Sequence, residues 1–228
     1  MCQNRNTMNQ SGPKRQIFEH LARVGKGFAH AARLDLLEVL AQGERSVDAL
    51  AKICAMPVSN ASHHLLILKD CGLAGSRKEG LQVFYRLADP EITATIAAIR
   101  RIAERQLAEV ERIVRENFTS RDTLLPVRRE ELLKLARRGE AVVIDVRPAE
   151  EYAAGHIAGA VNVPLDSLPR FLRKLPKEQE IVAYCRGPYC LLAFEAVEKL
   201  RKKGYRARRL EDGFPEWKAD QLPVTSNR

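Results

Sequence analysis

The apolar pattern of this chain changes its period near Asn117–Pro126, in the polar stretch NFTSRDTLLP. Before this stretch, apolar residues recur at helical spacing, as at Ile17, Leu21 and Val24. After it, short β-branched runs such as AVVIDVR and EIVAYC alternate with helical segments, which favours a parallel α/β sheet. The expected organisation is a disordered polar tail over residues 1–15, a first domain over 16–117, a linker over 118–126 and a second domain over 127–228.

The first domain shows the order of elements of a winged helix-turn-helix. Two short helices are expected over 47–54 and 59–71, broken at Met56-Pro57, with Ser46 and Ser59 as their caps. The sequence LAGSRKEGLQVFYRL then predicts two strands around a tight turn, and one long helix is expected from Glu91 to Asn117. A helix-turn-helix followed by a hairpin is a mainly α fold whose second helix enters a DNA groove.

That second helix carries apolar and polar residues on different sides. Ala61, Leu65, Leu68 and Gly72 recur at helical spacing and are predicted to face the core. Short polar side chains at its N-terminal end suit base edges and phosphates, and cations at the wing tip would meet a neighbouring phosphate. The predicted DNA-binding residues are Ser59, Asn60, Ser62, His63, His64, Arg77 and Lys78. Adjacent helical residues point about 100° apart, so His63 and His64 are not expected to share a metal ion.

The first half resembles the ArsR/SmtB family of bacterial winged-helix repressors through ARLDLLEVL, SVDALA, VSNASHHLLILKDCGL and RKEGLQVFYRL. The resemblance implies a homodimer, packed through the first and last helices of this half, on a two-fold-symmetric operator. The apolar side of the helix expected over Glu91–Asn117 needs a partner and suits that role. Many family members carry a Cys-x-Cys metal site where this chain has Arg45-Ser46-Val47-Asp48-Ala49, so the thiolates that soft metals prefer are missing.

The stretch VAYCRGPYC places two of the five cysteines, Cys185 and Cys190, on one tight loop. Cys185 ends a predicted buried strand, and reactive groups collect at the carboxyl ends of parallel strands. The N–H groups of such a loop, and the N-terminus of the helix expected from Leu191, would lower the pKa of this thiol, while Arg186 adds a cation. We therefore predict a reactive thiolate at Cys185, against the alternative of an inert buried thiol.

The second half resembles the rhodanese domain through VVIDVRPAEEYAAGHIAGAVNVP and IVAYCRGPYCLLAFEAVEKLRKKGYRARRLEDGFPEWK. The resemblance implies sulfur transfer, in which Cys185 takes a sulfane sulfur from a donor, holds it as a persulfide and passes it to a thiol acceptor. The sulfur-binding loop would comprise Arg186, Gly187, Pro188, Tyr189, Cys190 and Leu191. Asp145 and Arg147 match the family's Asp-Val-Arg and are expected to form a structural ion pair nearby. Phosphatases of this fold need Cys-x5-Arg, and this chain has Leu191 at the arginine position.

Cys190 has two interpretations that the sequence leaves open. It is either a small residue opening a helix or a resolving thiol that attacks the Cys185 persulfide. The second course would leave a disulfide or retain the sulfur as a trisulfide. Cys54 and Cys71 are expected to be small buried residues rather than metal ligands.

The predicted function is a DNA-binding repressor whose rhodanese domain senses or transfers reactive sulfur at Cys185. The expected partners are operator DNA, a sulfane-sulfur donor, a thiol acceptor and a second copy of the chain, and no cofactor or metal is expected. A net charge of +9 favours a polyanionic partner. No apolar run approaches a membrane span and the N-terminus lacks a signal-peptide core, so a cytoplasmic protein without a membrane partner is expected. The alternatives are a sulfurtransferase merely tethered to a DNA-binding domain and a thiol-based metalloid-responsive repressor.

Overall fold

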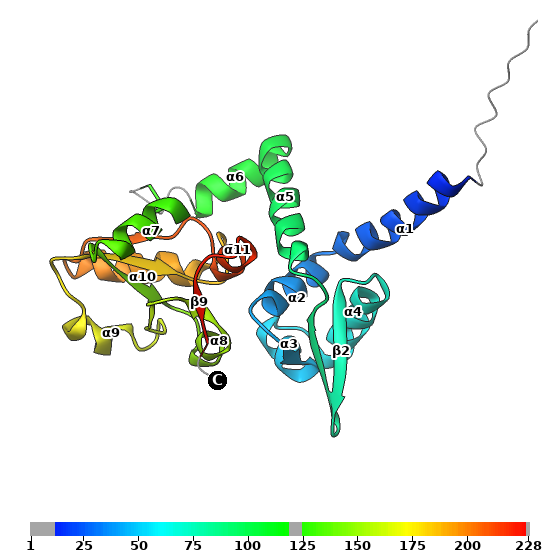
Figure 1. The fold of residues 1–228 in the computed structure, drawn as a ribbon, viewed down its shortest axis with the longest axis horizontal. Helices are drawn as coiled ribbons and strands as arrows, with labels where there is room; N and C mark the ends of the chain where they lie inside the picture. Colours follow the sequence, from blue (N-terminus) through cyan, green and yellow to red (C-terminus); the bar gives the residue numbers. More distant parts are fainter. Residues whose placement is uncertain (1–11, 119–124, 227–228) are drawn as a thin grey trace, which may run out of the picture.

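The computed structural model describes residues 12–118 and 125–226, which form two halves that lie side by side (Figure 1). The first half is mainly helical, with a three-stranded antiparallel sheet in the order β1-β3-β2. Its elements are α1 (Pro13–Phe28), α2 (Ala31–Ala41), β1 (Arg45–Ser46), α3 (Val47–Ile53), α4 (Val58–Asp70), β2 (Ala74–Glu79), β3 (Gln82–Leu87), α5 (Glu91–Gln106) and α6 (Ala108–Asn117). Helices α3 and α4 with the β2–β3 hairpin form the predicted winged helix-turn-helix.

Local signals in the sequence explain most boundaries around α3 and α4. The Ser46 side chain accepts a hydrogen bond from the N–H of Ala49 at 3.3 Å, which confirms the predicted cap of α3. The cap predicted at Ser59 is wrong, because α4 already begins at Val58, after Pro57 and without a side-chain cap. Proline fixes a backbone angle that suits a helix start, so α4 begins here without a capping side chain.

The helix predicted from Glu91 to Asn117 is divided in two, which corrects the sequence-based expectation. Leu107 adopts an extended conformation (φ −114°, ψ 102°) between α5 and α6. Neither glycine nor proline marks this position, so the cause is tertiary packing rather than local propensity. The bend directs α6 toward the second half (Figure 1). There the centroid of the Phe118 ring lies 5.2 Å from that of Tyr189 and 5.6 Å from that of Phe194.

The second half is an α/β unit around a four-stranded parallel sheet in the order β6-β4-β7-β8. A short antiparallel pair, β5–β9, lies beside it. The elements are α7 (Arg129–Arg137), β4 (Ala141–Asp145), α8 (Ala149–Ala154), β5 (His156–Ile157), β6 (Val161–Asn162), α9 (Leu168–Phe171), a 3-10 turn (Leu172–Lys174), β7 (Glu180–Tyr184), α10 (Leu191–Lys202), β8 (Ala207–Arg209), α11 (Phe214–Ala219) and β9 (Val224–Thr225). The predicted central parallel sheet is therefore present.

Alternation along β7 decides which way the Cys185 side chain faces. Ile181 and Ala183 enter one apolar cluster, which α10 covers, while Val182 and Tyr184 enter another cluster on the opposite side. Side chains of a strand point to alternate faces, so Cys185 continues the series that faces α10.

The expected tail and linker fall partly outside the described residues. Helix α1 begins at Pro13, ahead of the expected domain start at Gln16, and residues 1–11 of the expected tail lie outside the described chain. Residues 119–124 of the expected linker do so as well. None of the helices in 12–118 and 125–226 combines the length and the apolar content that a membrane span requires.

Candidate functional site

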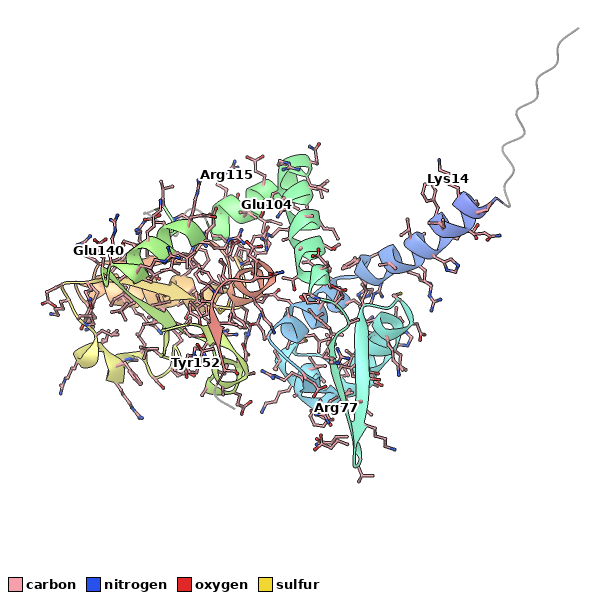
Figure 2. The ribbon with its side chains drawn as sticks, viewed as in Figure 1. Lys14, Arg77, Glu104, Arg115, Glu140 and Tyr152 are labelled. Carbon is pink, nitrogen blue, oxygen red and sulfur yellow. A yellow bond between two sulfur atoms is a disulfide. The ribbon has the colours of Figure 1, made fainter. Side chains whose placement is uncertain are left out.

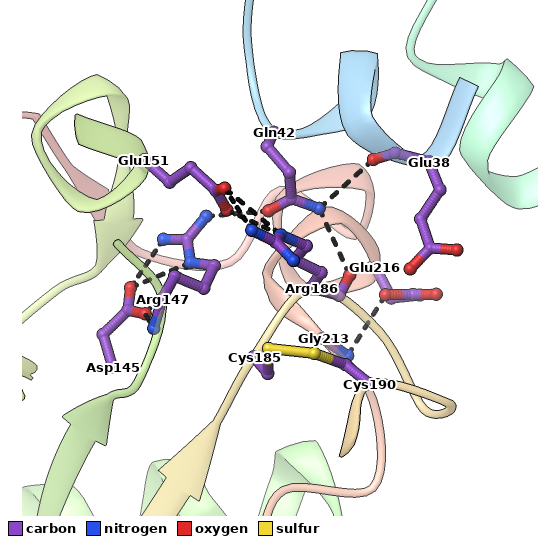
Figure 3. Close-up of a disulfide and its surroundings, with 10 residues drawn as sticks. All are labelled: Glu38, Gln42, Asp145, Arg147, Glu151, Cys185, Arg186, Cys190, Gly213 and Glu216. Atoms are coloured by element: carbon purple, nitrogen blue, oxygen red, sulfur yellow. Dashed lines mark hydrogen bonds and ion pairs between the residues drawn. A yellow bond between two sulfur atoms is a disulfide. The ribbon is translucent and has the colours of Figure 1, made fainter. Parts of the chain in front are cut away.

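The site lies where β7 ends and α10 begins, as predicted for a parallel sheet (Figure 3). Cys185 is almost fully buried and belongs to the apolar cluster under α10, whereas Cys190 is half-buried and occupies the N-cap position of α10. The two residues are joined by a disulfide, with their Cα atoms 6.2 Å apart. The loop of residues 186–189, named the sulfur loop below, is closed by this bond.

The turn before α11 holds the sulfur loop from behind. The N–H of Phe214 donates to the carbonyl oxygen of Cys185 at 3.0 Å. A Cβ atom on Gly213 would lie 2.4 Å from the carbonyl carbon and oxygen of Arg186 and from the nitrogen of Gly187. Only a glycine lets these two backbone segments approach so closely.

Backbone donors of the sulfur loop lack acceptors among the residues that the structure describes. The N–H of Cys190 donates to the carbonyl of Gly187 at 3.1 Å. Within the described residues, no backbone carbonyl accepts from the N–H groups of Arg186, Gly187 or Tyr189. Pro188 has no N–H, as the sequence indicated. These free donors, together with the N-terminus of α10, suit an anionic sulfur species.

Asp145 and Arg147 form the predicted ion pair, fully buried beside the site. The Nη2 of Arg147 lies 2.6 Å from Oδ2 of Asp145, and its Nε lies 3.0 Å from Oδ1. Nη2 also donates to the Gly155 carbonyl at 2.7 Å, and the Tyr184 hydroxyl donates to Asp145 at 2.6 Å. Burial and the neighbouring Asp145 raise the pKa of Tyr184, so this hydroxyl stays protonated as a donor.

The cation predicted at Arg186 is already matched by a carboxylate. Its Nη2 lies 2.7 Å from Oε1 of Glu151, and its Nε lies 3.1 Å from Oε2. Glu151 is buried, so this bidentate pair fixes the side chain of Arg186 firmly. The sulfur loop is thereby tied to α8.

The sulfur loop also contacts the DNA-binding half, which sequence reasoning did not anticipate. The Nε2 of Gln42, at the C-cap of α2, donates to the Arg186 carbonyl at 3.3 Å. The Tyr189 hydroxyl donates to the Glu104 carboxylate on α5. Figure 3 shows Gln42 between the sulfur loop and Arg147. Nothing in the sequence marks Gln42, because a polar residue ending a helix is usually solvated.

Further polar contacts join the halves around the loop. Arg100 on α5 lies 3.3 Å from the Glu216 carboxylate and 4.0 Å from that of Asp212, both in the region that packs behind the sulfur loop. A cavity of about 330 Å³ lies between the halves, and its lining includes Glu38, Ile96, Arg100, Pro188 and Glu216. Burial, followed by Glu216 and Asp35, raises the pKa of Glu38.

On α4 the predicted DNA-binding residues divide into two groups. Ser59, Asn60 and His63 are exposed, while Ser62 and His64 are half-buried. Of the predicted core residues, Ala61, Leu65 and Leu68 are fully buried, which confirms the orientation of the helix. The prediction is wrong for Gly72, which lies beyond the end of α4 and is exposed.

His64 turns toward the protein rather than toward solvent. Its ring lies 4.5 Å from the ring of His30, and its Nδ1 is buried without a hydrogen-bond partner in the described part of the chain. Burial, His30, Arg33 and His63 lower the pKa of His64, so a phosphate contact through a charged imidazole is disfavoured. Packing is the better account of this residue.

The two predicted DNA-binding cations of the wing, Arg77 and Lys78, differ in their ion pairs. Arg77 pairs with Glu44 at 2.6 Å and with Glu79, and it lies over the Phe84 ring. These hydrogen bonds, with Glu44 first, raise the pKa of Arg77. Lys78 is exposed, and no carboxylate of the described residues pairs with it. Figure 2 places Arg77 on the wing, away from the second half.

The remaining described cysteines differ from the loop pair. Cys71 is buried, and Cys54 is half-buried near the domain interface. Burial, Asp35 and Glu38 raise the pKa of Cys54 to about 11, which keeps its thiol protonated and unreactive. The described residues hold no group of three or more His, Cys, Asp or Glu side chains that could hold a metal ion.

Comparisons with known proteins find a matching family for each half of the chain. Residues 30–76 match the family model of the bacterial regulatory protein, arsR family, and residues 128–220 match the rhodanese-like domain. The chain is 41% identical to the HTH-type transcriptional regulator Rv0324 of Mycobacterium tuberculosis over 215 residues, covering 94% of each chain. It is 29% identical to a sulfurtransferase of Allochromatium vinosum over 94 residues, covering 41% of this chain and 86% of that protein.

Among solved structures, the chain is similar to a homodimeric winged helix-turn-helix DNA-binding domain, Mb0332 (fragment 1–100), from Mycobacterium bovis. The identity is 38%, with 43% of this chain and 92% of that chain covered and a TM-score of 0.40. The full-length similarity to a transcriptional regulator spans both halves, so the combination of the two domains is itself shared.

Proposed function

This chain belongs to the arsR family of bacterial regulatory proteins and carries a C-terminal rhodanese-like domain; on that premise we propose that reactive sulfur at Cys185 controls its affinity for operator DNA. The protein is a transcriptional regulator with a winged helix-turn-helix. Repression, the use of sulfur as the signal and a cytoplasmic location beside the DNA are parts of the proposal.

One observation carries the proposal: the sulfur loop contacts the DNA-binding half directly. Gln42 at the C-cap of α2 binds Arg186, next to Cys185, and Glu104 on α5 binds Tyr189, next to Cys190. A sulfurtransferase that was merely tethered would not need its loop to touch its neighbour. A sensor needs such contacts, because a modification acts on DNA binding only if it favours one state of the DNA-binding half.

The chemistry starts from the reduced loop. The Cys185 thiolate attacks the terminal sulfane sulfur of a persulfide or polysulfide donor and forms an S–S bond, while the S–S bond of the donor breaks and the rest of the donor leaves as a thiolate or a shorter polysulfide. The Cys190 thiolate then attacks the Sγ of Cys185, and the added sulfur leaves as hydrosulfide. Two thiols are oxidised to the disulfide seen in the structure, and one sulfane sulfur is reduced to sulfide. A trisulfide instead requires a second sulfane sulfur as the oxidant.

We propose that DNA is bound by a dimer. On α1, the side chains of Ile17, Phe18 and Leu21 are more than half exposed, as are Ile102 and Leu107 at the end of α5. Exposed apolar residues gathered on the first and last helices of this half suit a second copy of the chain. The two copies would present Ser59, Asn60 and His63 of each α4 to two half-sites.

A sulfurtransferase is the second candidate, favoured by the free N–H groups of the sulfur loop and by the similarity to a named sulfurtransferase. In that case the persulfide at Cys185 passes to an external thiol acceptor instead of to Cys190. Steady formation of thiocyanate from thiosulfate and cyanide, with unchanged DNA affinity, would favour this candidate.

The test is a gel-shift series with the full chain. The DNA is a duplex selected from a random-sequence pool by the reduced wild-type protein, and each sample is measured with and without sodium polysulfide. We expect polysulfide to change the affinity of the wild type and to leave Cys185→Ser unchanged. Mass spectrometry should show a disulfide in the wild type and one added sulfur in Cys190→Ser. Identical wild-type affinity in both conditions would refute the sensor.

A further inference from the structure

The interface between the halves contains one side chain that touches the sulfur loop, the buried ion pair and α2 at once. We propose that Gln42 is the positioning residue that couples the sulfur loop to the DNA-binding half. The inference rests on the proposed function and names the route of its regulation. Gln42 is 3% exposed, although it ends a helix of a different domain from the sulfur loop.

Both the oxygen and the nitrogen of the Gln42 side-chain amide form hydrogen bonds. Its Oε1 accepts from Nη1 of Arg147 at 2.8 Å, and its Nε2 donates to the carbonyls of Arg186 at 3.3 Å and Glu38 at 3.4 Å. A guanidinium only donates and a carbonyl only accepts, so the orientation of the amide is fixed by its partners. Gln42 therefore binds the Arg147 guanidinium through its oxygen and the Arg186 carbonyl through its nitrogen (Figure 3).

The two partners of Gln42 in the second half are held in different ways. Arg147 is fully buried and anchored by Asp145 and the Gly155 carbonyl, so it is a fixed point. The Arg186 carbonyl belongs to the loop that the Cys185–Cys190 bond closes, so in this proposal it is the partner that moves when the bond forms or breaks, while the Arg186 side chain stays paired with Glu151. A change at sulfur would thus alter the bond from Gln42 to the loop, while the bond to Arg147 keeps the two halves docked.

Helix α2 carries a shift at Gln42 to the DNA-reading helix. Leu36, Leu37 and Leu40 of α2 are buried in one apolar cluster with Leu65 and Leu68 of α4. Close-packed cores transmit displacements rather than absorbing them. The C-terminal end of α2 therefore links the sulfur loop to the helix that presents Ser59 and Asn60.

The hydrogen bonds of Gln42 suggest a variant that keeps its bond with Arg147 and removes its bond with Arg186. In Gln42→Glu the carboxylate still accepts from Arg147, so the halves stay docked. It has no N–H for the Arg186 carbonyl and repels it, so the loop is released. Gln42→Met removes both bonds at similar side-chain length. Gln221→Glu makes the same chemical change at an exposed position and serves as the matched control.

The experiment measures fluorescence anisotropy with the selected duplex, on reduced and polysulfide-treated full-length protein. For the wild type and Gln221→Glu we expect an affinity change of roughly 5- to 150-fold, the usual range of allosteric coupling. For Gln42→Glu and Gln42→Met we expect less than about a 2-fold change, both samples matching the reduced wild type. Mass spectrometry should show the same products at Cys185 and Cys190 in every variant.

Outcomes separate this inference from the proposed function. An unresponsive wild type overturns the proposed function and the coupling with it. A responsive wild type with an equally responsive Gln42→Glu overturns the coupling alone. Hydrogen exchange on the wild type gives a reading that needs no variant: amides in the last turn of α2 should change protection when polysulfide is added. Unchanged protection there also overturns the role of Gln42.

Discussion

The proposed DNA-reading surface and the sulfur loop of this protein are built in opposite ways. On α4 and the wing, Ser59, Asn60 and Lys78 are exposed. In the sulfur loop, Arg186 is held by Glu151 and Gln42, and Tyr189 is held by Glu104. A surface that reads DNA stays hydrated until DNA replaces the water, whereas a thiol that signals to another domain needs fixed neighbours. Mutations should therefore affect binding on the first surface and stability around the second.

The largest effect is expected at the buried ion pair beside the sulfur loop. Arg147→Met leaves Asp145 buried without its counter-ion and removes the donor to Gln42. Losing one partner of a buried pair costs about 3–5 kcal/mol. Urea-induced unfolding measures the loss. The control is Arg112→Met on α6, whose exposed pairs with Glu109 and Glu116 should contribute below about 1 kcal/mol. Equal losses in both variants would remove the contrast between the two kinds of site.

The second-largest effect is expected in the reactivity of the thiols, where the Cys54 thiol and the Cys185 thiol of the sulfur loop should differ. The raised pKa of Cys54, about 11, gives it roughly 100-fold less thiolate at pH 8 than an ordinary cysteine, and we expect iodoacetamide to modify it correspondingly slowly. After reduction, Cys185 should be modified first, as mass spectrometry of peptides can show. In urea, Cys54 should lose its protection. Faster modification of folded Cys54 than of Cys185 would contradict the assignment.

The same shift predicts how stability depends on pH. Folded Cys54 keeps its proton to a higher pH than unfolded Cys54, because burial disfavours the thiolate. Protonated Cys54 contributes fully to the free energy of unfolding below the ordinary thiol pKa. This contribution is lost as pH rises from there toward 11, because the unfolded chain loses its proton first. Cys54→Ala should flatten the fall in unfolding free energy over that window.

Both halves and their order could be predicted from the sequence, because each rests on local signals. Helical spacing placed Ala61, Leu65 and Leu68 in the core, and a β-branched run ending at a cysteine placed Cys185 at a strand end. These features depend on residues close together in the chain, where periodicity and turn chemistry decide the outcome.

The contacts that connect the halves could not be predicted in this way. The residues Gln42 and Arg186 are far apart in the chain, and only the docked structure shows them in contact. The bend at Leu107 has the same origin, since it serves the packing of Phe118 on the second half and no local residue demands it. Tertiary contacts of this kind override local propensity.

The packing of the sulfur loop can be tested with a single methyl group. Gly213→Ala places a Cβ atom against the backbone of Arg186 and Gly187, and overpacking of this kind costs about 1–3 kcal/mol. Thermal unfolding measures the loss. Gly25→Ala on α1 is the control, because no atom lies within 4 Å of its Cβ position. That variant should gain up to about 1 kcal/mol from helix propensity. A stable Gly213→Ala protein would mean that the loop yields easily.

The smallest effect is expected on the exposed surface, where it should appear in binding and not in stability. Lys78 is unpaired among the described carboxylates, so Lys78→Ala should leave the unfolding free energy unchanged. If Lys78 meets a phosphate, its loss weakens binding to the selected duplex about 5-fold and lowers the salt slope by about 1 per protomer. Lys202→Ala on α10, in the other half, should change neither the affinity for the duplex nor the salt slope. An unchanged slope in Lys78→Ala would remove the wing tip from the DNA interface, leaving the exposed residues of α4 to make the contact alone.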